Sequence, residues 1–313
     1  MPDTPQSIHP FALGFVARPA ARQLAIDLGR YCRIVDPTAP VPPAYSLSQF
    51  RTRHVEQGQA GTCWAHAGAM DAEVSALALG YESFPVCRRL VGWAGKQLEG
   101  GGNPSNGGDP TDALLSMVES KGVGIAHEAL CPYTDDSRTL GTKPSQNVFD
   151  DAKKSWGIAI VEVTSDDDAR QMIYHGQAVA NGIWWPYGWD NQKTFMDTIG
   201  TGTYGHALLE IGYAQPGIFD QFAWFQFDNW HGLLYPPLPT ALASKVPGYK
   251  PISFDRTSDF WVRADIYERV RGYGNAVRVG LTDFQGIRKT IVSKPGFLEG
   301  GWIGAPGSEW AII

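Results

Sequence analysis

The residues best suited to chemistry lie in one segment, residues 57–64, which reads Gln-Gly-Gln-Ala-Gly-Thr-Cys-Trp. Thr62 is a good N-cap residue, and the alanine-rich run 63–79 predicts a helix that begins at Cys63. A thiol is nucleophilic as the thiolate, and the positive end of a helix stabilises that charge. The Gln57 amide, a few residues upstream, can donate a hydrogen bond to an oxyanion. The segment therefore indicates acyl chemistry; the alternative is that Cys63 is only a small buried hydrophobic residue.

Further short motifs follow this segment along the chain. They are Asn106-Gly107-Gly108, Pro132-Tyr133, Gly205-His206-Ala207 and Asp228-Asn229-Trp230-His231-Gly232. Taken in this order with residues 57–65, they resemble the motifs of the papain-like cysteine peptidases over roughly residues 41–270. The resemblance implies a cysteine endopeptidase, in which the thiolate attacks a peptide carbonyl to form an acyl-enzyme thioester and a histidine protonates the leaving amine.

Two residues far along the chain match the family's other catalytic positions. His206 precedes an apolar strand, and its separation from Cys63 agrees with the roughly 130–150 residues expected in this family. The main competing histidine is His66, which lies near Cys63 on the same helix face, and we expect it to have a packing role. The resemblance implies that Asn229 orients His206, and Asp228 is the alternative.

The sequence departs from the family pattern directly after Asn229. In the family a tryptophan stands two residues after the asparagine and shields the Asn–His hydrogen bond from water. Here Trp230 follows Asn229 at once, so on a strand it would face the other way. Either a local bulge restores the shield or His231 replaces it.

The resemblance also assigns binding roles. Gln57 and the backbone N–H of Cys63 would form an oxyanion hole. The residues expected to bind a polypeptide substrate are Gly107, Gly108, Trp64 and Gly205. For the two adjacent glycines the alternative is a loop turn without a binding role. The mechanism needs neither a metal nor an organic cofactor.

Helices dominate the first half of the domain and strands the second. A helix is expected over 110–121, with Asp109 as its cap, and another from Ser165 to about Tyr174, which acidic residues favour at its positive end. Strands are expected over 178–185, 207–213, 223–229 and 260–266. This order predicts an α+β fold. The resemblance implies the papain-like two-lobed form, with a helical N-terminal lobe, an antiparallel barrel-like C-terminal lobe and the active-site cleft between them.

The chain divides into three parts. Residues 1–40 form a preface with a possible short helix over 19–31 and a proline-rich end. Residues 41–270 form the peptidase domain, with the helical lobe at about 41–135 and the sheet lobe at about 136–270. Residues 271–313 form a C-terminal extension of unknown role. In a competing, non-enzymatic interpretation, the preface and the extension dock a peptidase fold into a larger protein assembly.

Composition narrows the functions further. The net charge of −6 and the absence of a Lys/Arg-rich block disfavour nucleic-acid binding. No apolar run approaches the roughly 20 residues that span a bilayer, and the N-terminus shows no secretory signal pattern. The four cysteines are Cys32, Cys63, Cys87 and Cys131. Ala60 and Ser105 stand where secreted relatives carry a disulfide, so we expect no required disulfide, which favours a reducing cytoplasm.

One other enzymatic interpretation competes with the endopeptidase. A cell-wall amidase or peptidase can be built on a related Cys-His fold. Such enzymes usually lack a glutamine six residues ahead of a Cys-Trp pair, and they lack the Asn-Gly-Gly motif. The presence of both features here favours a polypeptide substrate over peptidoglycan.

Overall fold

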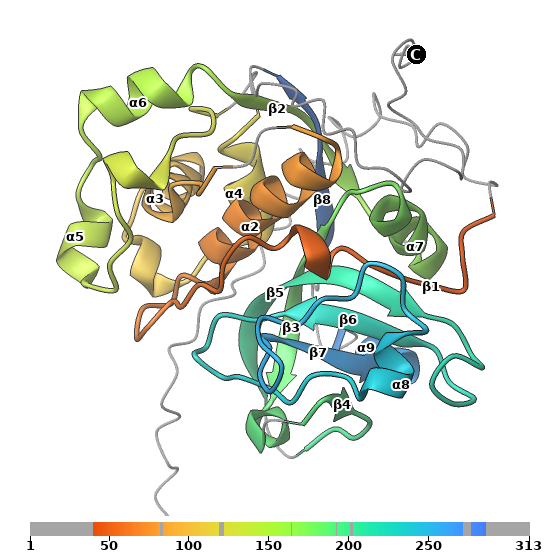
Figure 1. The fold of residues 1–313 in the computed structure, drawn as a ribbon. Coiled ribbons are helices and arrows are strands. Elements are labelled where there is room, and N and C mark those ends of the chain that lie inside the picture. The colour runs from red at the N-terminus through yellow and green to blue at the C-terminus, as the bar shows by residue number, and fades with distance from the viewer. Residues whose placement is uncertain are drawn as a thin grey trace, which may run out of the picture.

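The computed structural model describes residues 40–81, 84–118, 122–163, 165–191, 193–200, 203–271 and 277–285. The helix expected over 19–31 and Cys32 lie outside these ranges. Helices gather on one side of the molecule and most of the sheet on the other, with α2 (Cys63–Ala78) between them (Figure 1). Among the residues described, no helix combines the length and the apolar character needed to cross a bilayer.

Helix α2 is the central helix of the molecule, as expected. It begins at Cys63, is buried on nearly every side and contacts α3, α4 and β5. Thr62 occupies the N-cap position, but its side chain does not cap the helix; its hydroxyl instead hydrogen-bonds the Tyr133 hydroxyl at 2.6 Å. The helix ends before Gly80, whose φ of 82° is readily adopted only by glycine. Because Cys63 is fully buried and α2 contacts β5, the start of the helix lies inside the protein, next to the sheet.

Four further helices complete the helical side. They are α3 (Arg88–Leu98), α4 (Pro110–Leu115), α5 (Ser137–Gly141) and α6 (Gln146–Ala152). Asp109 caps α4 as expected, since its carboxylate accepts from the Thr111 N–H. The helix predicted over 110–121 nevertheless ends at Leu115, because the chain turns back and the Ser116 carbonyl accepts from the Val123 N–H instead of continuing the helix.

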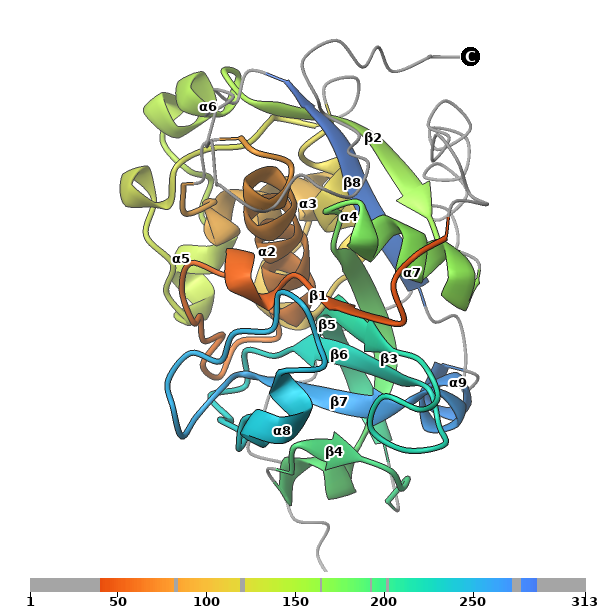
Figure 2. The same cartoon turned by 45° about the vertical axis from the view of Figure 1, so that its right-hand side comes forward.

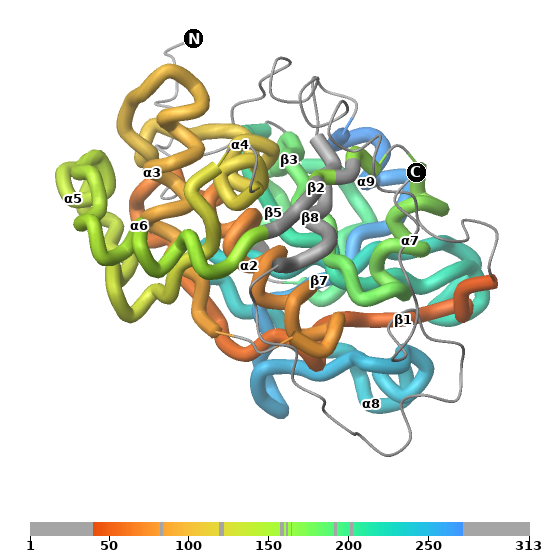
Figure 3. Tube along the Cα trace, turned by 90° about the horizontal axis from the view of Figure 1, so that it is seen from above, coloured from red at the N-terminus to blue at the C-terminus, as the bar shows by residue number. Residues whose placement is uncertain are grey.

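The remaining helices lie beside the sheet. Helix α7 (Asp166–Tyr174) begins where predicted, with a capping box between Ser165 and Asp168. Helices α8 (Thr240–Ala243) and α9 (Ala264–Arg271) follow later in the chain. Seen from above, α3, α5 and α6 group on one side and α7, α8 and α9 on the other (Figure 3). Four 3-10 helices cover Ser48–Phe50, Pro104–Asn106, Glu128–Leu130 and Tyr187–Asn191.

The described strands form one open sheet in the order β2-β8-β3-β5-β6-β7-β4, with β1 paired to β5 (Figure 2). The strands are β1 (Ala44–Ser46), β2 (Trp156–Glu162), β3 (Val179–Pro186), β4 (Phe195–Met196), β5 (Thr203–Ala214), β6 (Trp224–Asp228), β7 (Asp259–Arg263) and β8 (Val277–Gln285). The pairs are antiparallel except for β4 with β7. The barrel-like lobe expected from the sequence is therefore an open sheet, because its two end strands do not pair with each other.

One strand ends earlier than predicted, and another was not predicted at all. The strand expected over 260–266 stops at Arg263, because its partner β6 begins at Trp224 and offers no further ladder positions; α9 starts at the next residue. Strand β8 lies inside the C-terminal extension, and it pairs with both β2 and β3. This part of the extension is thus built into the sheet. The domain limits at residues 40, 135 and 270, and an assembly role for the terminal segments, stay predictions.

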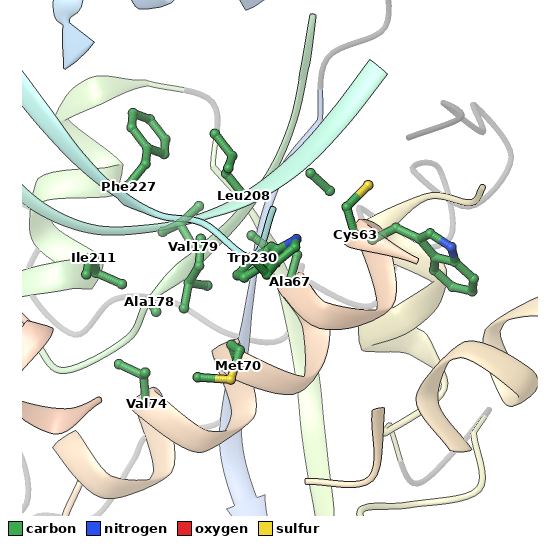
Figure 4. Packing of buried hydrophobic residues seen from close by; sticks show 14 of the residues in the cluster. Cys63, Ala67, Met70, Val74, Ala178, Val179, Leu208, Ile211, Phe227 and Trp230 are labelled. Atoms are coloured by element: carbon green, nitrogen blue, oxygen red, sulfur yellow. The ribbon is translucent and has the colours of Figure 1, made fainter. Parts of the chain in front are cut away.

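The core lies where α2 packs against the sheet. On α2, Ala67, Met70 and Val74 face the strands (Figure 4). Opposite them lie Ala178, Val179 and Ile211, all fully buried. Burying a Leu, Ile or Met side chain stabilises a fold by roughly 1.5–3 kcal/mol. This packing holds the N-terminus of α2, and with it Cys63, against strand β5.

Candidate active site

The Cys63 thiol lies at the junction of the helical side and the sheet. It has no exposed surface, and its sulfur lies within hydrogen-bond reach of the backbone amide of Ala207. Burial raises the pKa of the thiol to about 12, and the backbone amides of Ala207, Trp64 and Cys63 itself lower it by less. The amides at the helix start thus act in the expected direction, but burial has the larger effect on the pKa of the thiol. Ionisation needs a base that takes the proton.

His206 is the histidine next to this contact. It lies on β5, opposite Ile183 of β3, and it directly precedes the Ala207 amide that the Cys63 sulfur approaches. Its side chain is fully buried. The structure thus places Cys63 beside the segment of β5 that carries His206, although the two residues are remote in sequence. The packing of α2 on β5 is the cause, because it sets the first turn of the helix beside this part of the strand.

Asn229 holds the histidine from the other side. Its Oδ1 accepts a hydrogen bond from His206 Nε2 at 2.9 Å, and its Nδ2 donates to the Tyr235 hydroxyl at 2.9 Å. The same Oδ1 accepts from the Trp230 N–H at 2.8 Å, so the amide orientation is fixed by three partners. A carbonyl oxygen at Nε2 requires a proton there, so in the neutral ring the lone pair lies on Nδ1.

Asp228, the alternative orienting residue, makes its hydrogen bonds to residues other than His206. Its carboxylate accepts from Arg51 Nη1 at 3.0 Å and from the Ser258 hydroxyl. Successive residues of a strand point to opposite faces, so the side chains of Asp228 and Asn229 diverge. Of the two, Asn229 is the one that contacts His206.

The ring next to His206 is that of His231. The centroids of the two imidazoles lie 3.6 Å apart. The ladder pairs Leu209 with Asp228, and continuing this register places His231 directly opposite His206. Trp230 points to the other face, where its ring stacks on His66 with centroids 6.0 Å apart. Of the two alternatives left by the sequence, His231 replaces the shifted tryptophan.

A second aromatic ring was missed by the sequence analysis. Trp185 of β3 is fully buried and packs edge-on against His206, with centroids 5.2 Å apart, and against His231 at 5.7 Å. Its indole N–H donates to Asp190 at 2.9 Å. Because Ile183 is opposite His206, Trp185 is its diagonal neighbour across the two strands. This contact could not be predicted from the sequence, because the chain has several tryptophans and only the strand register shows which one lies beside His206.

Gln57 is anchored in the loop that precedes α2. It is fully buried, and its Nε2 donates to the Ala60 carbonyl at 2.9 Å. Its N–H donates to the Trp230 carbonyl at 2.9 Å, and its carbonyl accepts from the Tyr133 hydroxyl at 2.7 Å. An amide nitrogen carries two protons, so Nε2 can donate a second hydrogen bond. These contacts tie the loop both to the sheet and to the segment around Tyr133.

The expected substrate-binding residues fall into two groups. Gly107 has a φ of 86°, and a Cβ at Gly108 would lie 2.5 Å from the Trp64 ring, so the chain at Gly108 needs glycine. Trp64 itself has no exposed surface and donates to the Pro104 carbonyl at 3.3 Å. It lies beneath this loop, so any part in binding is indirect. Gly205 lies on β5, next to the histidine.

His66 has the structural role expected of it. Its Nδ1 donates to the Thr62 carbonyl at 2.9 Å, and its Nε2 accepts from Arg88 Nη1 at 3.1 Å. Burial, and then the positive charge of Arg88, lower the pKa of His66 to about 3. The ring is therefore neutral with both nitrogens engaged, which leaves it unsuited to act as a base for Cys63.

Comparisons with known proteins agree with this architecture. No family model and no curated protein matches the sequence. Among solved structures, xylellain, a cysteine protease from Xylella fastidiosa, is 19% identical, with 90% of this chain and 94% of that chain covered and a TM-score of 0.59. Procathepsin B S9 from Trypanosoma congolense is 13% identical (90% and 87% covered, TM-score 0.58). The bromelain protease from Ananas comosus is 16% identical (77% and 99%, TM-score 0.55).

The chain therefore has the α+β fold of the papain-like cysteine proteases, as the motifs predicted. At these identities the likeness is one of fold. What the chain does chemically has to be argued from its own residues.

Proposed function

We propose that this chain is a cysteine endopeptidase that hydrolyses polypeptides through Cys63 and His206. The observation that carries the proposal is the contact of the Cys63 sulfur with the amide of Ala207, the residue after His206. The hydrogen bond from His206 Nε2 to Asn229 supports it, because it orients the ring and leaves Nδ1 for proton transfer.

The chemistry follows from these positions. His206 takes the proton of the Cys63 thiol, since burial disfavours a thiolate without a paired cation. The thiolate attacks a peptide carbonyl carbon, and the oxyanion accepts hydrogen bonds from the Cys63 N–H and Gln57 Nε2. The imidazolium then protonates the leaving amine. A water molecule, activated by neutral His206, hydrolyses the thioester.

Substrate binding uses the loop opposite the histidine. Gly107 and Gly108 would pair with the extended substrate backbone, and Trp64 would support that loop from below. Gly205 would let the substrate pass close to β5, because it adds no side chain there. Since the Cys63 thiol has no exposed surface in this conformation, substrate entry requires a movement that opens a path to the sulfur.

Thiol labelling and proteolysis together test the proposal. We expect an epoxide thiol probe to modify Cys63 and to block casein hydrolysis by the full chain. In Cys63→Ala the probe should no longer label this position. Casein hydrolysis should fall by roughly 10⁴-fold or more, because the nucleophile is gone. Mass spectrometry of peptides locates the label. Hydrolysis that survives in Cys63→Ala, or digestion of peptidoglycan but not casein, would contradict the endopeptidase.

The stacked ring of His231 gives a second test. We expect His231→Ala to lower kcat about tenfold with little change in KM, because water would reach the His206–Asn229 hydrogen bond. His231→Phe keeps an aromatic face over His206 and should retain activity within about threefold. Steady-state kinetics on a peptide substrate measures both. Equal losses in the two variants would show that the imidazole itself, rather than the cover it provides, is needed.

A further inference from the structure

A pair of thiols lies outside the proposed active site, on the helical side. Cys87 is the N-cap of α3, where its sulfur accepts from the Leu90 N–H at 3.4 Å. The Cys87 thiol also lies 3.3 Å from the Cys131 carbonyl, to which it can donate. The single proton of the Cys87 thiol can instead be shared with the Cys131 sulfur, an interaction that shifts the pKa of both thiols. Both cysteines are free thiols, buried in one apolar cluster with Leu90 and Val148.

The surroundings make the two sulfurs chemically unequal. The Cys87 hydrogen bond lowers the pKa of Cys131, burial raises it, and the Arg89 guanidinium lowers it again, so that the pKa of Cys131 is about 7. The same hydrogen bond, together with burial, raises the pKa of Cys87. Of the two thiols, Cys131 is therefore the one that loses its proton more readily. This is the arrangement of an attacking sulfur beside a resolving one.

We propose that Cys131 and Cys87 form an oxidation site, at which a hydroperoxide converts the dithiol into a reversible disulfide. The Cys131 thiolate attacks the peroxide, the O–O bond breaks, and a sulfenic acid and hydroxide form. The Cys87 thiol then attacks the sulfenic sulfur; an S–S bond forms, and water leaves with the thiol proton. In sum, two thiols are oxidised and one peroxide is reduced to two waters.

The position of the pair suits such a reaction. Cys131 is 4% exposed and follows Leu130, which is 42% exposed, so a molecule as small as hydrogen peroxide needs only a slight opening to reach it. The two residues join the start of α3 to the segment that leads to Tyr133. A disulfide would close a loop of roughly 45 residues and restrict the unfolded chain. This oxidation does not require peptidase activity.

The test uses the full chain carrying Cys63→Ala, so that the proposed nucleophile cannot react. After treatment with hydrogen peroxide at pH 7.5, peptide mapping without reductant should show a Cys87–Cys131 cross-link that dithiothreitol reverses. The oxidised protein should also unfold roughly 5–10 °C higher than the reduced protein. Peptides in which both cysteines stay reduced, or in which Cys131 stops at sulfinic acid, would overturn the proposal.

Two matched variants separate the roles of the sulfurs, each checked for folding by circular dichroism. With Cys87→Ser, Cys131 should be oxidised beyond the sulfenic acid, and dithiothreitol should not restore it. With Arg89→Met, disulfide formation should slow about three- to tenfold. The charged and titratable groups around Cys131 are Cys87, Arg89 and Glu128. Because the thiolate fraction grows through pH 7, the rate should rise between pH 6 and 8; a flat profile would count against a Cys131 thiolate.

Discussion

Replacing His206 by alanine is expected to lower kcat/KM for peptide hydrolysis by about 10⁴- to 10⁶-fold. The reason is specific to this site. Burial raises the pKa of the Cys63 thiol to about 12, so without His206 the reactive thiolate is a minute fraction of the enzyme at neutral pH. The leaving amine would also lose its proton donor. Steady-state rates and the rate of epoxide labelling at Cys63 measure the two consequences separately.

The matched control is His127→Ala. His127 has a ring about half exposed and pairs with Asp151 at 2.8 Å on the surface of the helical side. Its loss should leave kcat/KM unchanged within about twofold, since surface ion pairs contribute little. If His206→Ala kept more than a hundredth of the activity, another group would have to serve as the base. Labelling that slowed while hydrolysis stayed normal would separate the probe reaction from catalysis.

Replacing Arg51 by methionine is expected to destabilise the fold by about 3–5 kcal/mol. The Arg51 guanidinium lies between two buried carboxylates, 3.0 Å from Asp228 and 2.9 Å from Asp259. Both acids raise the pKa of Arg51 although burial opposes the charge. Methionine fills similar volume but leaves two anions facing each other without a cation. Urea unfolding measures this loss of free energy, and calorimetry should show Tm falling by roughly 10 °C.

Two further variants, one a control and one a compensating combination, test this prediction. Arg263→Met removes a partly exposed ion pair with Asp265, and it should cost less than about 1 kcal/mol. Adding Asp228→Asn and Asp259→Asn to Arg51→Met should restore part of the lost stability, because the uncompensated charges are then gone. Equal effects of Arg51→Met and Arg263→Met would mean that the buried network contributes no more than a surface pair.

Local chemistry made much of the fold predictable. A helix start depends on residues within a few positions, so the start of α2 at Cys63, the Asp109 cap and the helix start at Ser165 could be predicted directly. Strands β3, β5 and β6 were located within a few residues, because alternating apolar patterns are local too. The helix over 110–121 and the strand over 260–266 came out too long. Their ends depend on where the chain turns back and on which strand is their partner.

For the candidate active site, too, some features could be predicted from the sequence and others depend on the tertiary structure. Sequence alone determined that Cys63 stands at a helix start behind Gln57, and that His206 and Asn229 belong to the pattern. Only the tertiary structure decided that Asn229 and not Asp228 contacts the histidine, and that the rings covering it are His231 and Trp185. These contacts depend on strand register, which no local signal records. Burial, which is equally a property of the whole fold, raises the pKa of the Cys63 thiol.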